Sequence, residues 1–507
     1  MKQALLTRST RPDRSAARRS PALRASPIAD VRRGGSSALF VTTEIADFVK
    51  TGGLGDVAAA LPRALSRWHD VRVLVPGYPS VLENIRGLRW EGWTRPVAGL
   101  PAARIGRGCT EDGLGIYVVR ETSLFERVGS PYLSPSGEDW GDNAVRFALL
   151  SMAAAQIGAG SAGLGWRPDL LHLNDWPTAL APSYLRWHGY ATPCLLTIHN
   201  LAHQGLFPLE LKESLGIPSW AGDADYHGQL SFLRAGLLQA DMLTTVSGHY
   251  AQQITQASQG MGMHAMLHRR ASQGRLVGIV NGIDDSWNIE RDPALPLAPD
   301  RDPDSIRRLA RLALCAEMGL EPHKGPLFAF VARMVAQKGI DLVCEVGAQI
   351  VRAGGQLALI GCGDADMEAA VRRLARRFPG RIAAHIGFTE AVARRMFAGS
   401  DFLLMPSRFE PCGLSQMYAQ AYGSLPIAHA TGGLVDTIED GVTGLLFADS
   451  CASELRKALA RAFRIHDEPE LMSAMRHAAM ALKHGWEHSA RKYSALYGRA
   501  MAQPAAA

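Results

Sequence analysis

Two neighbouring loops in the second half of the chain carry residues suited to bind phosphate or sugar groups. One is the segment 406–414, Pro-Ser-Arg-Phe-Glu-Pro-Cys-Gly-Leu, and the other is 431–434, Thr-Gly-Gly-Leu. Each follows an apolar run typical of a buried strand, and α/β sheets bind phosphorylated ligands where their strands end. The candidate binding residues in these loops are Glu410, Cys412, Gly413, Leu414, Thr431, Gly432 and Gly433.

A further glycine loop lies almost a whole domain upstream, at residues 50–56, Lys-Thr-Gly-Gly-Leu-Gly-Asp. Gly52 and Gly53 leave backbone amides free at the start of a predicted helix over 57–65, and Lys50 adds a full positive charge. The order of the residues is not that of a P-loop. Glycine loops of this type on two separate sheets favour a cleft enzyme that acts on a nucleotide-sugar.

Two positive charges follow the first predicted strand of the second half, at Arg333 and Lys338. Arginine offers a planar fork to phosphate oxygens, and lysine adds a point charge to the same loop. In the loop 361–364, Gly361 and Gly363 let a base or a ribose approach the backbone. Because ligands bind at the carboxyl ends of strands in open sheets, we interpret both loops as parts of one site.

Three strand ends carry groups that could face a sugar. The segments 172–176, His-Leu-Asn-Asp-Trp, and 197–201, Thr-Ile-His-Asn-Leu, each end a predicted strand of the first half. A histidine in such a place is more often a structural hydrogen-bonding group, but polar residues at two ends of one sheet favour a functional edge. The candidates are Asp175 and His199 from the first half and Glu410 from the second.

Short apolar runs that alternate with helical patterns must position these loops. In the first half they lie at 38–42, 71–75, 170–173, 194–198, 242–246 and 277–280, and in the second at 327–331, 357–360, 382–386, 402–405 and 427–428. Continuous apolar strands alternating with helices predict parallel sheets covered on both faces. The fold class is therefore α/β with two doubly wound domains, joined by a stretch dense in Asp, Pro and Arg.

Composition argues against a nucleic-acid protein. The chain has 507 residues, is 47% hydrophobic and carries a net charge of +6. Residues 1–33 hold nine basic residues against two acidic ones, a net charge of +7, so the rest of the chain is close to neutral. General binding to a polyanion is therefore unsupported, and no nucleic-acid partner is expected.

The cysteines, one uncharged segment and the basic head bear on the cellular compartment of the protein. Seven scattered cysteines without C-x-x-C spacing fit reduced thiols in a cytoplasmic compartment. Residues 148–166 lack charge but are dominated by Ala, Gly, Ser and Gln, which predicts a soluble helix and no membrane association. The basic head is an organelle transit peptide, which would place the protein in a plastid stroma, or a disordered extension.

Taken in order, these segments resemble the bacterial glycogen synthase and plant starch synthase family, retaining glucosyltransferases with the GT-B fold. The motifs that match lie at 50–56, 197–205, 281–284, 337–341, 406–414 and 431–434, and the match runs from about residue 37 to 500. The resemblance implies an N-terminal acceptor-side domain and a C-terminal donor-side domain, both Rossmann-like and facing across a cleft. The expected division is a basic extension at 1–36, the acceptor domain at 37–280, a linker at 281–308, the donor domain at 309–484, and at 485–507 a helix packing back on the acceptor domain, with a tail.

The family implies transfer of glucose from ADP-glucose to the non-reducing end of an α-1,4-glucan, such as glycogen or a maltooligosaccharide. Lys50, Arg333 and Lys338 would hold the diphosphate, and Gly53 and Gly433 would supply amides. Asp175, His199 and Glu410 would surround the glucosyl ring, with Asn281 and Asp56 positioning donor or acceptor. The positive charges can supply what a divalent ion would, so neither a metal nor another cofactor is expected.

Three departures and three alternatives accompany the resemblance. Many related GT-B enzymes have a second glutamate eight positions after the first, where this chain has Tyr418, and both the linker after Asn281 and the loop 78–80 are short. Retention of configuration is compatible with a covalent intermediate between two carboxylates or with attack from the front face. A related enzyme that uses UDP-glucose or another acceptor is the runner-up, and a non-catalytic glucan-binding protein is the alternative from another class.

Overall fold

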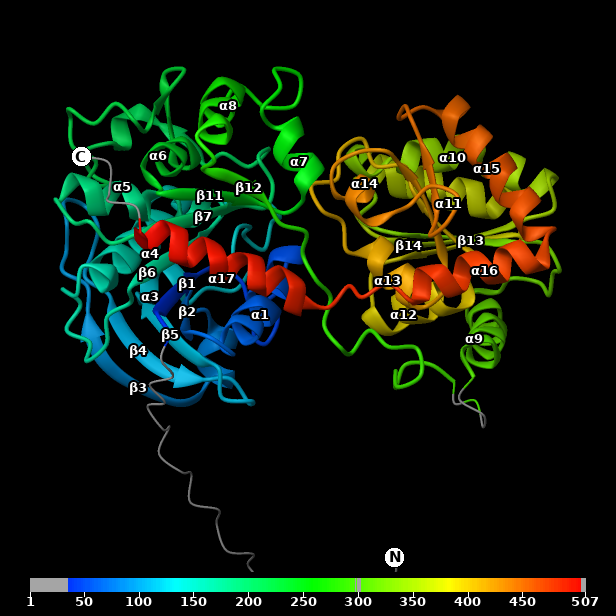
Figure 1. The fold of residues 1–507 in the computed structure, drawn as a ribbon, viewed down its shortest axis with the longest axis horizontal. Helices are drawn as coiled ribbons and strands as arrows, with labels where there is room; N and C mark the ends of the chain where they lie inside the picture. Colours follow the sequence, from blue (N-terminus) through cyan, green and yellow to red (C-terminus); the bar gives the residue numbers. More distant parts are fainter. Residues whose placement is uncertain (1–34, 297, 299–301, 503–507) are drawn as a thin grey trace, which may run out of the picture.

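The structure, a computed structural model, describes residues 35–296, 298 and 302–502. The chain forms two α/β lobes that lie side by side (Figure 1). The predicted basic head falls almost wholly outside the described residues. Among the described helices, none has both the length and the apolar composition needed to cross a membrane.

The N-terminal lobe is built on a mixed sheet. Its order is β12-β11-β7-β6-β1-β2-β5-β4-β3. The strands are β1 (Ser37–Val41), β2 (Asp70–Pro76), β3 (Arg86–Trp93), β4 (Arg104–Cys109), β5 (Gly115–Arg120), β6 (Leu170–Asn174), β7 (Cys194–Ile198), β11 (Met242–Thr245) and β12 (Leu276–Gly278). The six strands predicted for this half are present and parallel, whereas β4 runs antiparallel to both β3 and β5. This edge ribbon was not predicted, because β3 is largely exposed and has no continuous apolar run.

Helices cover the central strands, which are buried along almost their whole length. One helix layer contains α1 and α17, and a second contains α4, α5 and α6. The helices of this lobe are α1 (Gly53–Leu65), α2 (Pro79–Asn84), α3 (Thr122–Phe125), α4 (Asn143–Gly158), α5 (Leu180–Trp187), α6 (Phe232–Gln239), α7 (Gly248–Gln253), α8 (His264–Ser272) and α17 (Trp486–Ala502). A small antiparallel sheet of β8 (Leu206–Pro208), β10 (Gln229–Ser231) and β9 (Asp225–Tyr226) follows β7. The helix expected in the uncharged segment is α4, a buried helix of the globular core.

The C-terminal lobe has a fully parallel sheet in the order β15-β14-β13-β16-β17-β18. Its strands are β13 (Leu327–Val331), β14 (Gln356–Gly361), β15 (Ile382–Ile386), β16 (Phe402–Met405), β17 (Leu425–His429) and β18 (Leu445–Phe447). Its helices are α9 (Pro303–Met318), α10 (Ile340–Arg352), α11 (Ala365–Arg377), α12 (Glu390–Gly399), α13 (Ser415–Ala421), α14 (Gly433–Thr437), α15 (Ala452–His466) and α16 (Pro469–Met480). The α/β prediction with two doubly wound sheets is confirmed. The helix α9 begins inside the segment 281–308 and packs on α12.

The chain crosses between the lobes twice, and the two crossings are paired. The Ile283 N–H donates to the His484 carbonyl (2.9 Å), and Ile283 bridges Gly485. A Cβ atom on Gly282 would lie 2.8 Å from both the Cα and the backbone nitrogen of Trp486. The crossings can therefore approach this closely only because residue 282 has no side chain.

A stacked cluster ties the first crossing to the C-terminal lobe. The Trp287 ring stacks on Tyr418 with ring centroids 3.6 Å apart, and the Arg394 guanidinium lies 3.9 Å from the Trp287 centroid. Arg394 also pairs with the buried Asp292 at 2.8 Å. Tyr418, which stands where many related enzymes have a second glutamate, thus serves here to hold the linker.

The helix α17 returns to the N-terminal lobe, where it packs on α1 and on the strands β6 and β7 (Figure 1). His172 joins them, because its Nδ1 pairs with the Tyr497 hydroxyl and its Nε2 with the Thr197 hydroxyl, both at 2.8 Å. Burial holds the pKa of His172 well below its usual value, so the ring is neutral. His172 is therefore a structural group, whereas Asn174 and Asp175, two and three residues further along, lie in the site described below.

We expect Gly282→Ala to destabilise the hinge. The added methyl group has to push two backbone segments apart, and overpacking of this kind costs about 1–3 kcal/mol. Thermal unfolding should show a midpoint several degrees below that of the wild type. The control is Gly498→Ala in α17, where a Cβ meets open space and a helix favours alanine; an equal loss in both variants would contradict this account of the crossings.

Candidate active site

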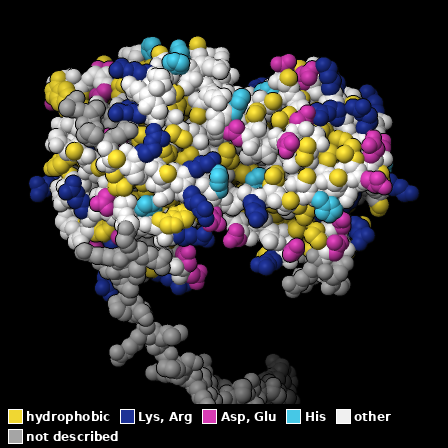
Figure 2. Space-filling model, in the orientation of Figure 1, with side chains coloured by type: hydrophobic (Ala, Val, Ile, Leu, Met, Phe, Trp, Pro, Cys, Tyr) yellow, Lys and Arg dark blue, Asp and Glu magenta, His cyan; other side chains and the backbone are white. Residues whose placement is uncertain are grey.

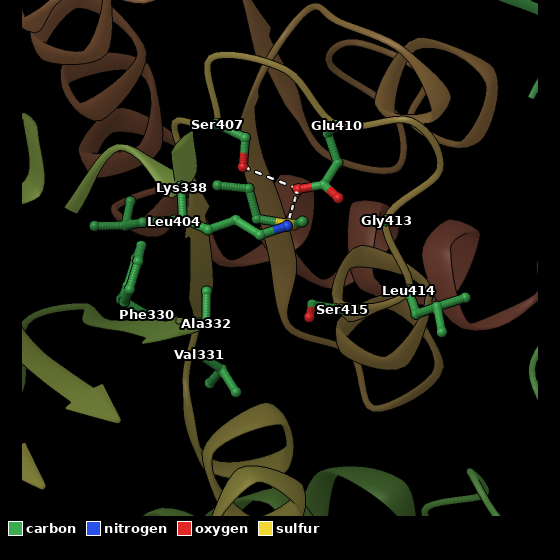
Figure 3. Close-up of a pocket in the computed structure, with 11 residues that line it drawn as sticks. Phe330, Val331, Ala332, Lys338, Leu404, Ser407, Glu410, Gly413, Leu414 and Ser415 are labelled. Atoms are coloured by element: carbon green, nitrogen blue, oxygen red, sulfur yellow. Dashed lines mark hydrogen bonds and ion pairs between the residues drawn. The ribbon is translucent and has the colours of Figure 1, made fainter. Parts of the chain in front are cut away.

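The carboxyl end of the C-terminal sheet carries a buried ion pair. The Lys338 Nζ lies 2.5 Å from the Glu410 Oε2, and the Ser407 hydroxyl donates to the same oxygen at 3.0 Å (Figure 3). The Glu410 side chain is only 7% exposed. A small pocket of about 50 Å³ beside the pair is closed by the ends of β13 and β16 and has room for a few water molecules. Sequence positions 338 and 410, 72 residues apart, are therefore brought into direct contact.

The two glycine loops of this lobe pack backbone against backbone. Gly432 has φ +48°, and a Cβ there would lie 1.9 Å from the Glu410 carbonyl oxygen. At Gly433 a Cβ would meet the Cys412 carbonyl oxygen at 2.3 Å. The Gly433 N–H donates to the Glu410 and Pro411 carbonyls, both at 3.1 Å. The glycine pair thus fixes the position of Glu410, and in this arrangement the Gly433 amide is used within the protein.

Arg333 lies on an exposed loop of the same edge, and its Nη2 is 3.5 Å from the Gln337 Oε1. The backbone of this loop pairs with the next strand end, because the Met334 N–H donates to the Cys362 carbonyl at 2.9 Å. A Cβ at Gly361 would lie 1.9 Å from the Ala332 carbonyl oxygen. The predicted glycine loop 361–364 is therefore adjacent to the loop that carries Arg333.

Asp175 and His199 meet at the carboxyl end of β6 and β7. The Asp175 Oδ1 accepts hydrogen bonds from the backbone N–H groups of His199 (2.6 Å) and Asn200 (3.3 Å). Burial raises the pKa of Asp175 to about 7, although these two N–H groups favour the carboxylate. Asp175 also has φ +55°, a strained backbone conformation for a residue with a side chain and one found at functional sites.

His199 is held as a neutral ring with a defined orientation. Burial lowers its pKa to about 3. Its Nε2 lies 2.9 Å from the Asn174 Oδ1, and the Asn174 amide nitrogen donates to the Val41 carbonyl. The Asn174 oxygen is therefore the acceptor, so His199 carries its proton on Nε2 and presents Nδ1 as an acceptor.

The loop 50–56 is shaped by a residue that sequence analysis missed. Glu44 accepts hydrogen bonds from the Thr51 N–H (2.7 Å), the Thr51 hydroxyl (2.7 Å) and the Gly52 N–H (3.1 Å). The Gly52 amide is thus engaged by the protein. In the sequence, Glu44 is visible only as a carboxylate just after the first strand. Its contacts with the loop 50–56 form only when that loop folds back over it.

Lys50 pairs with Asp56 rather than with the other lobe. Its Nζ lies 2.7 Å from the Asp56 Oδ1, and its side chain is 41% exposed. Burial raises the pKa of Asp56, and the charge of Lys50 opposes this shift. Among the described residues, Lys50 therefore makes no hydrogen bond to the Lys338–Glu410 pair.

Groups from the two lobes face each other across the cleft, where the lobes meet along a furrow (Figure 2). A Cβ at Gly53 would lie 3.6 Å from the Leu414 side chain. Burial and, to a lesser extent, the positive charge of Arg333 lower the pKa of His203, which follows the His199 loop. Acceptor-side and donor-side candidates are therefore close in space.

Asn281 and Cys412 lie between the lobes. The Asn281 side chain is buried, and its Oδ1 has no hydrogen-bond partner among the described residues. Burial raises the pKa of the Cys412 thiol to about 12, although a hydrogen bond from the Asn281 backbone N–H lowers it. Cys412 therefore stays protonated and packs as an apolar group, whereas the Asn281 oxygen is a buried acceptor that no donor of the described residues reaches.

No group of three or more His, Cys, Asp or Glu side chains suited to hold a metal ion occurs within residues 35–296, 298 and 302–502.

Comparison with known proteins agrees with this architecture. Residues 37–269 match the starch synthase catalytic domain, and residues 325–464 match the glycosyl transferases group 1 domain. A glycogen synthase of Xanthomonas campestris pv. campestris is 56% identical over 465 residues, covering 92% of this chain and 98% of the relative. A glycogen synthase of Pseudomonas fluorescens is 52% identical and covers 94% of this chain and 92% of the relative.

Solved structures match at the level of the whole fold. The catalytic domain of starch synthase IV from Arabidopsis thaliana, bound to ADP and acarbose, superposes with a TM-score of 0.81 at 30% identity, covering 92% of this chain and all of that domain. A sucrose-phosphate synthase of Thermosynechococcus elongatus, at 19% identity and a TM-score of 0.56, shares the fold. The sequence identities and the paired lobes together show that this chain belongs to the glycogen synthase family, the glycosyltransferases that elongate an α-1,4-glucan with glucose from ADP-glucose.

Proposed function

We propose that this enzyme binds ADP-glucose against the C-terminal lobe and a glycogen or maltooligosaccharide end against the N-terminal lobe, and joins them with retention of configuration. The observation that carries the proposal is the Lys338–Glu410 pair at the sheet edge of one lobe, together with Asp175 and the His199 loop at the sheet edge of the other. The related starch synthase structure with ADP and acarbose supports a nucleotide and a sugar chain as ligands. A cytoplasmic location and the domain boundaries given above stay predictions.

The diphosphate needs positive charge as the glycosidic bond breaks. Negative charge then develops on the departing phosphate, and fixed cations in a site that excludes water stabilise it. Lys338 and Arg333 are the cations of the donor-side edge, and Lys50 adds a third when it exchanges Asp56 for the ligand. Thr431, Gly432, Gly361 and Gly363 belong to loops that would shape the nucleotide's surroundings.

The glucosyl ring would lie between the two lobes. His199 presents a neutral Nδ1 acceptor to a sugar hydroxyl, and the Asp175 carboxylate is close to the same loop. The Asn281 oxygen offers a further buried acceptor between the lobes. Glu410, held by Lys338 and Ser407, supplies negative charge that favours an oxocarbenium-like state.

Front-face attack suits the hydrogen bonding of the two carboxylates. Asp175 accepts two backbone N–H bonds on Oδ1, and Glu410 accepts from Lys338 and Ser407 on Oε2, so hydrogen bonding draws charge from each carboxylate and weakens it as a nucleophile. We therefore propose that the acceptor's 4-hydroxyl oxygen bonds to the anomeric carbon as the bond to the phosphate oxygen breaks. The hydroxyl proton passes to the departing phosphate, and ADP leaves.

Lys338→Ala is expected to lower kcat about 100- to 1,000-fold, because one fixed charge at the leaving group is lost. The measurement is glucose incorporation from labelled ADP-glucose into glycogen. Lys324→Ala, a change at an exposed lysine of the same lobe, is the matched control and should behave as the wild type. Wild-type turnover in the Lys338 variant would contradict the proposed role of Lys338 at the leaving group.

The pH dependence of kcat/KM should follow the ionisation of the Asp175 carboxyl group. If its ionised form supports the reaction, kcat/KM rises with pH through a single ionisation near 7, while His199, with a pKa of about 3, adds no step between pH 5 and 9. Asp175→Asn should abolish this step together with most of the activity. A profile of the wild type that is flat from pH 5 to 8, measured with the same donor and acceptor, would contradict the assignment.

A donor comparison tests the nucleotide. ADP-glucose is expected to give a kcat/KM at least about tenfold above that of UDP-glucose on a maltooligosaccharide acceptor, a preference worth about 1.4 kcal/mol. Maltooligosaccharides alone, without nucleotide-sugar, provide the background. Equal or better use of UDP-glucose would favour the runner-up function.

A further inference from the structure

The short helix α7 lies between the two halves of the site. It follows β11, and the Thr245 hydroxyl at the end of that strand donates to the Ile198 carbonyl at 2.8 Å. Ile198 immediately precedes His199. The base of α7 is thus fixed to the strand end that carries one of the sugar-facing groups.

Toward the acceptor side, α7 holds the loop that begins with His199. The Tyr250 hydroxyl accepts a hydrogen bond from the Leu201 N–H at 3.1 Å. Tyr250 is buried, which raises the pKa of its hydroxyl, so it stays protonated and packed. A displacement of α7 would therefore also displace the His199 loop.

Toward the donor side, the first turn of α7 contacts the Glu410 loop. The Ser247 hydroxyl donates to the Pro411 carbonyl at 2.6 Å and accepts from the Tyr250 N–H at 3.2 Å. The His249 N–H donates to the Asp436 carboxylate at 3.0 Å. The start of the helix is therefore capped jointly by its own serine and by a carboxylate of the other lobe.

The last residue of α7 contacts the second glycine loop. The Gln253 Oε1 accepts from the Gly432 N–H at 3.1 Å, and its Nε2 donates to the Thr431 hydroxyl at 3.2 Å. Both the oxygen and the nitrogen of the Gln253 side-chain amide thus form hydrogen bonds across the lobe interface. Since Gly432 and Gly433 pack on the backbone of Glu410, the position of this loop also sets the position of that carboxylate.

We propose that Gln253 is a positioning residue for glucosyl transfer: its amide holds the Thr431–Gly433 loop against α7 and so brings Glu410 and His199 into register when the lobes are together. The proposal rests on the donor and acceptor roles given under Proposed function. Gln253 does not need to touch the substrate, because it acts through the loop. Loss of its two hydrogen bonds should disfavour the arrangement in which both half-sites face each other.

The test uses three variants of the full chain. Gln253→Ala removes both contacts. Gln253→Glu retains them, because a carboxylate can accept from the Gly432 N–H and from the Thr431 hydroxyl. Gln252→Ala, on the neighbouring exposed residue, is the matched control. For each protein, kcat and the KM values of donor and acceptor are measured. Calorimetry gives the number of ADP molecules bound per chain, and X-ray scattering with saturating ADP gives the radius of gyration.

The expected result is a fall in kcat of about tenfold in Gln253→Ala, with acceptor KM within about twofold of wild type. ADP should still bind one molecule per chain, and the radius of gyration with ADP should exceed that of the wild type. Gln253→Glu should restore kcat to within about threefold while raising donor KM through its added negative charge. Gln252→Ala should match the wild type in every measurement.

Wild-type kcat and radius of gyration in Gln253→Ala would overturn the proposal. So would a fall in kcat matched by an equal loss of ADP-binding sites, which indicates damaged protein, or a Gln253→Glu variant as slow as Gln253→Ala. The scattering measurement does not depend on transfer. A wild type that fails to transfer glucose would thus contradict the proposed function, and the inference would then be judged on the radius of gyration alone.

Discussion

The candidate site is organised around one ion pair, Lys338 with the buried Glu410, at the carboxyl edge of the C-terminal sheet. Taking both charges out of water costs several kcal/mol for each ion, and their attraction offsets this only when geometry and further hydrogen bonds are good. The Ser407 hydroxyl provides such a bond. A pair of this kind adds little to stability that well-packed apolar residues could not provide, which supports a chemical role for its two charges.

The surrounding backbone keeps the pair in place. The two glycine loops approach so closely that side chains at Gly432 or Gly433 would overlap carbonyl groups of the Glu410 segment. On the opposite lobe, Asp175 is held in a strained conformation against the His199 loop. The paired crossings at Ile283 and His484 limit how the lobes can move. Each half of the site is held by its own backbone contacts, and what these contacts do not set is the position of one half relative to the other.

The sequence was sufficient to predict the parallel strands, because buried strands of an α/β sheet are continuous apolar runs that local composition shows. It was also sufficient to place Lys338, Glu410, Asp175 and His199 at strand ends. That Lys338 contacts Glu410 could not be derived from spacing, since the residues are 72 positions apart and meet only when β13 and β16 pair.

Other features depended on tertiary contacts. The ribbon containing β3 was missed because its residues are mostly exposed and stabilised by pairing with β4. Glu44 was missed because its partners are backbone amides of a loop that returns to it. The same contact shows that the Gly52 amide, expected to be free for a ligand, is engaged within the protein. Tyr418 was noted only as a departure, and its stacking on Trp287 emerges only in the folded chain.

We propose that the fixed charges of Lys338 and Arg333, and not a metal ion, hold the diphosphate beside Glu410. The most direct measurement is a crystal structure of the chain with ADP, grown in the presence of a chelator. The account predicts the Lys338 Nζ and the Arg333 guanidinium within hydrogen-bond distance of diphosphate oxygens, with no ion between them. A diphosphate bound away from both side chains, or ADP density that appears only when a divalent cation is added, would contradict it.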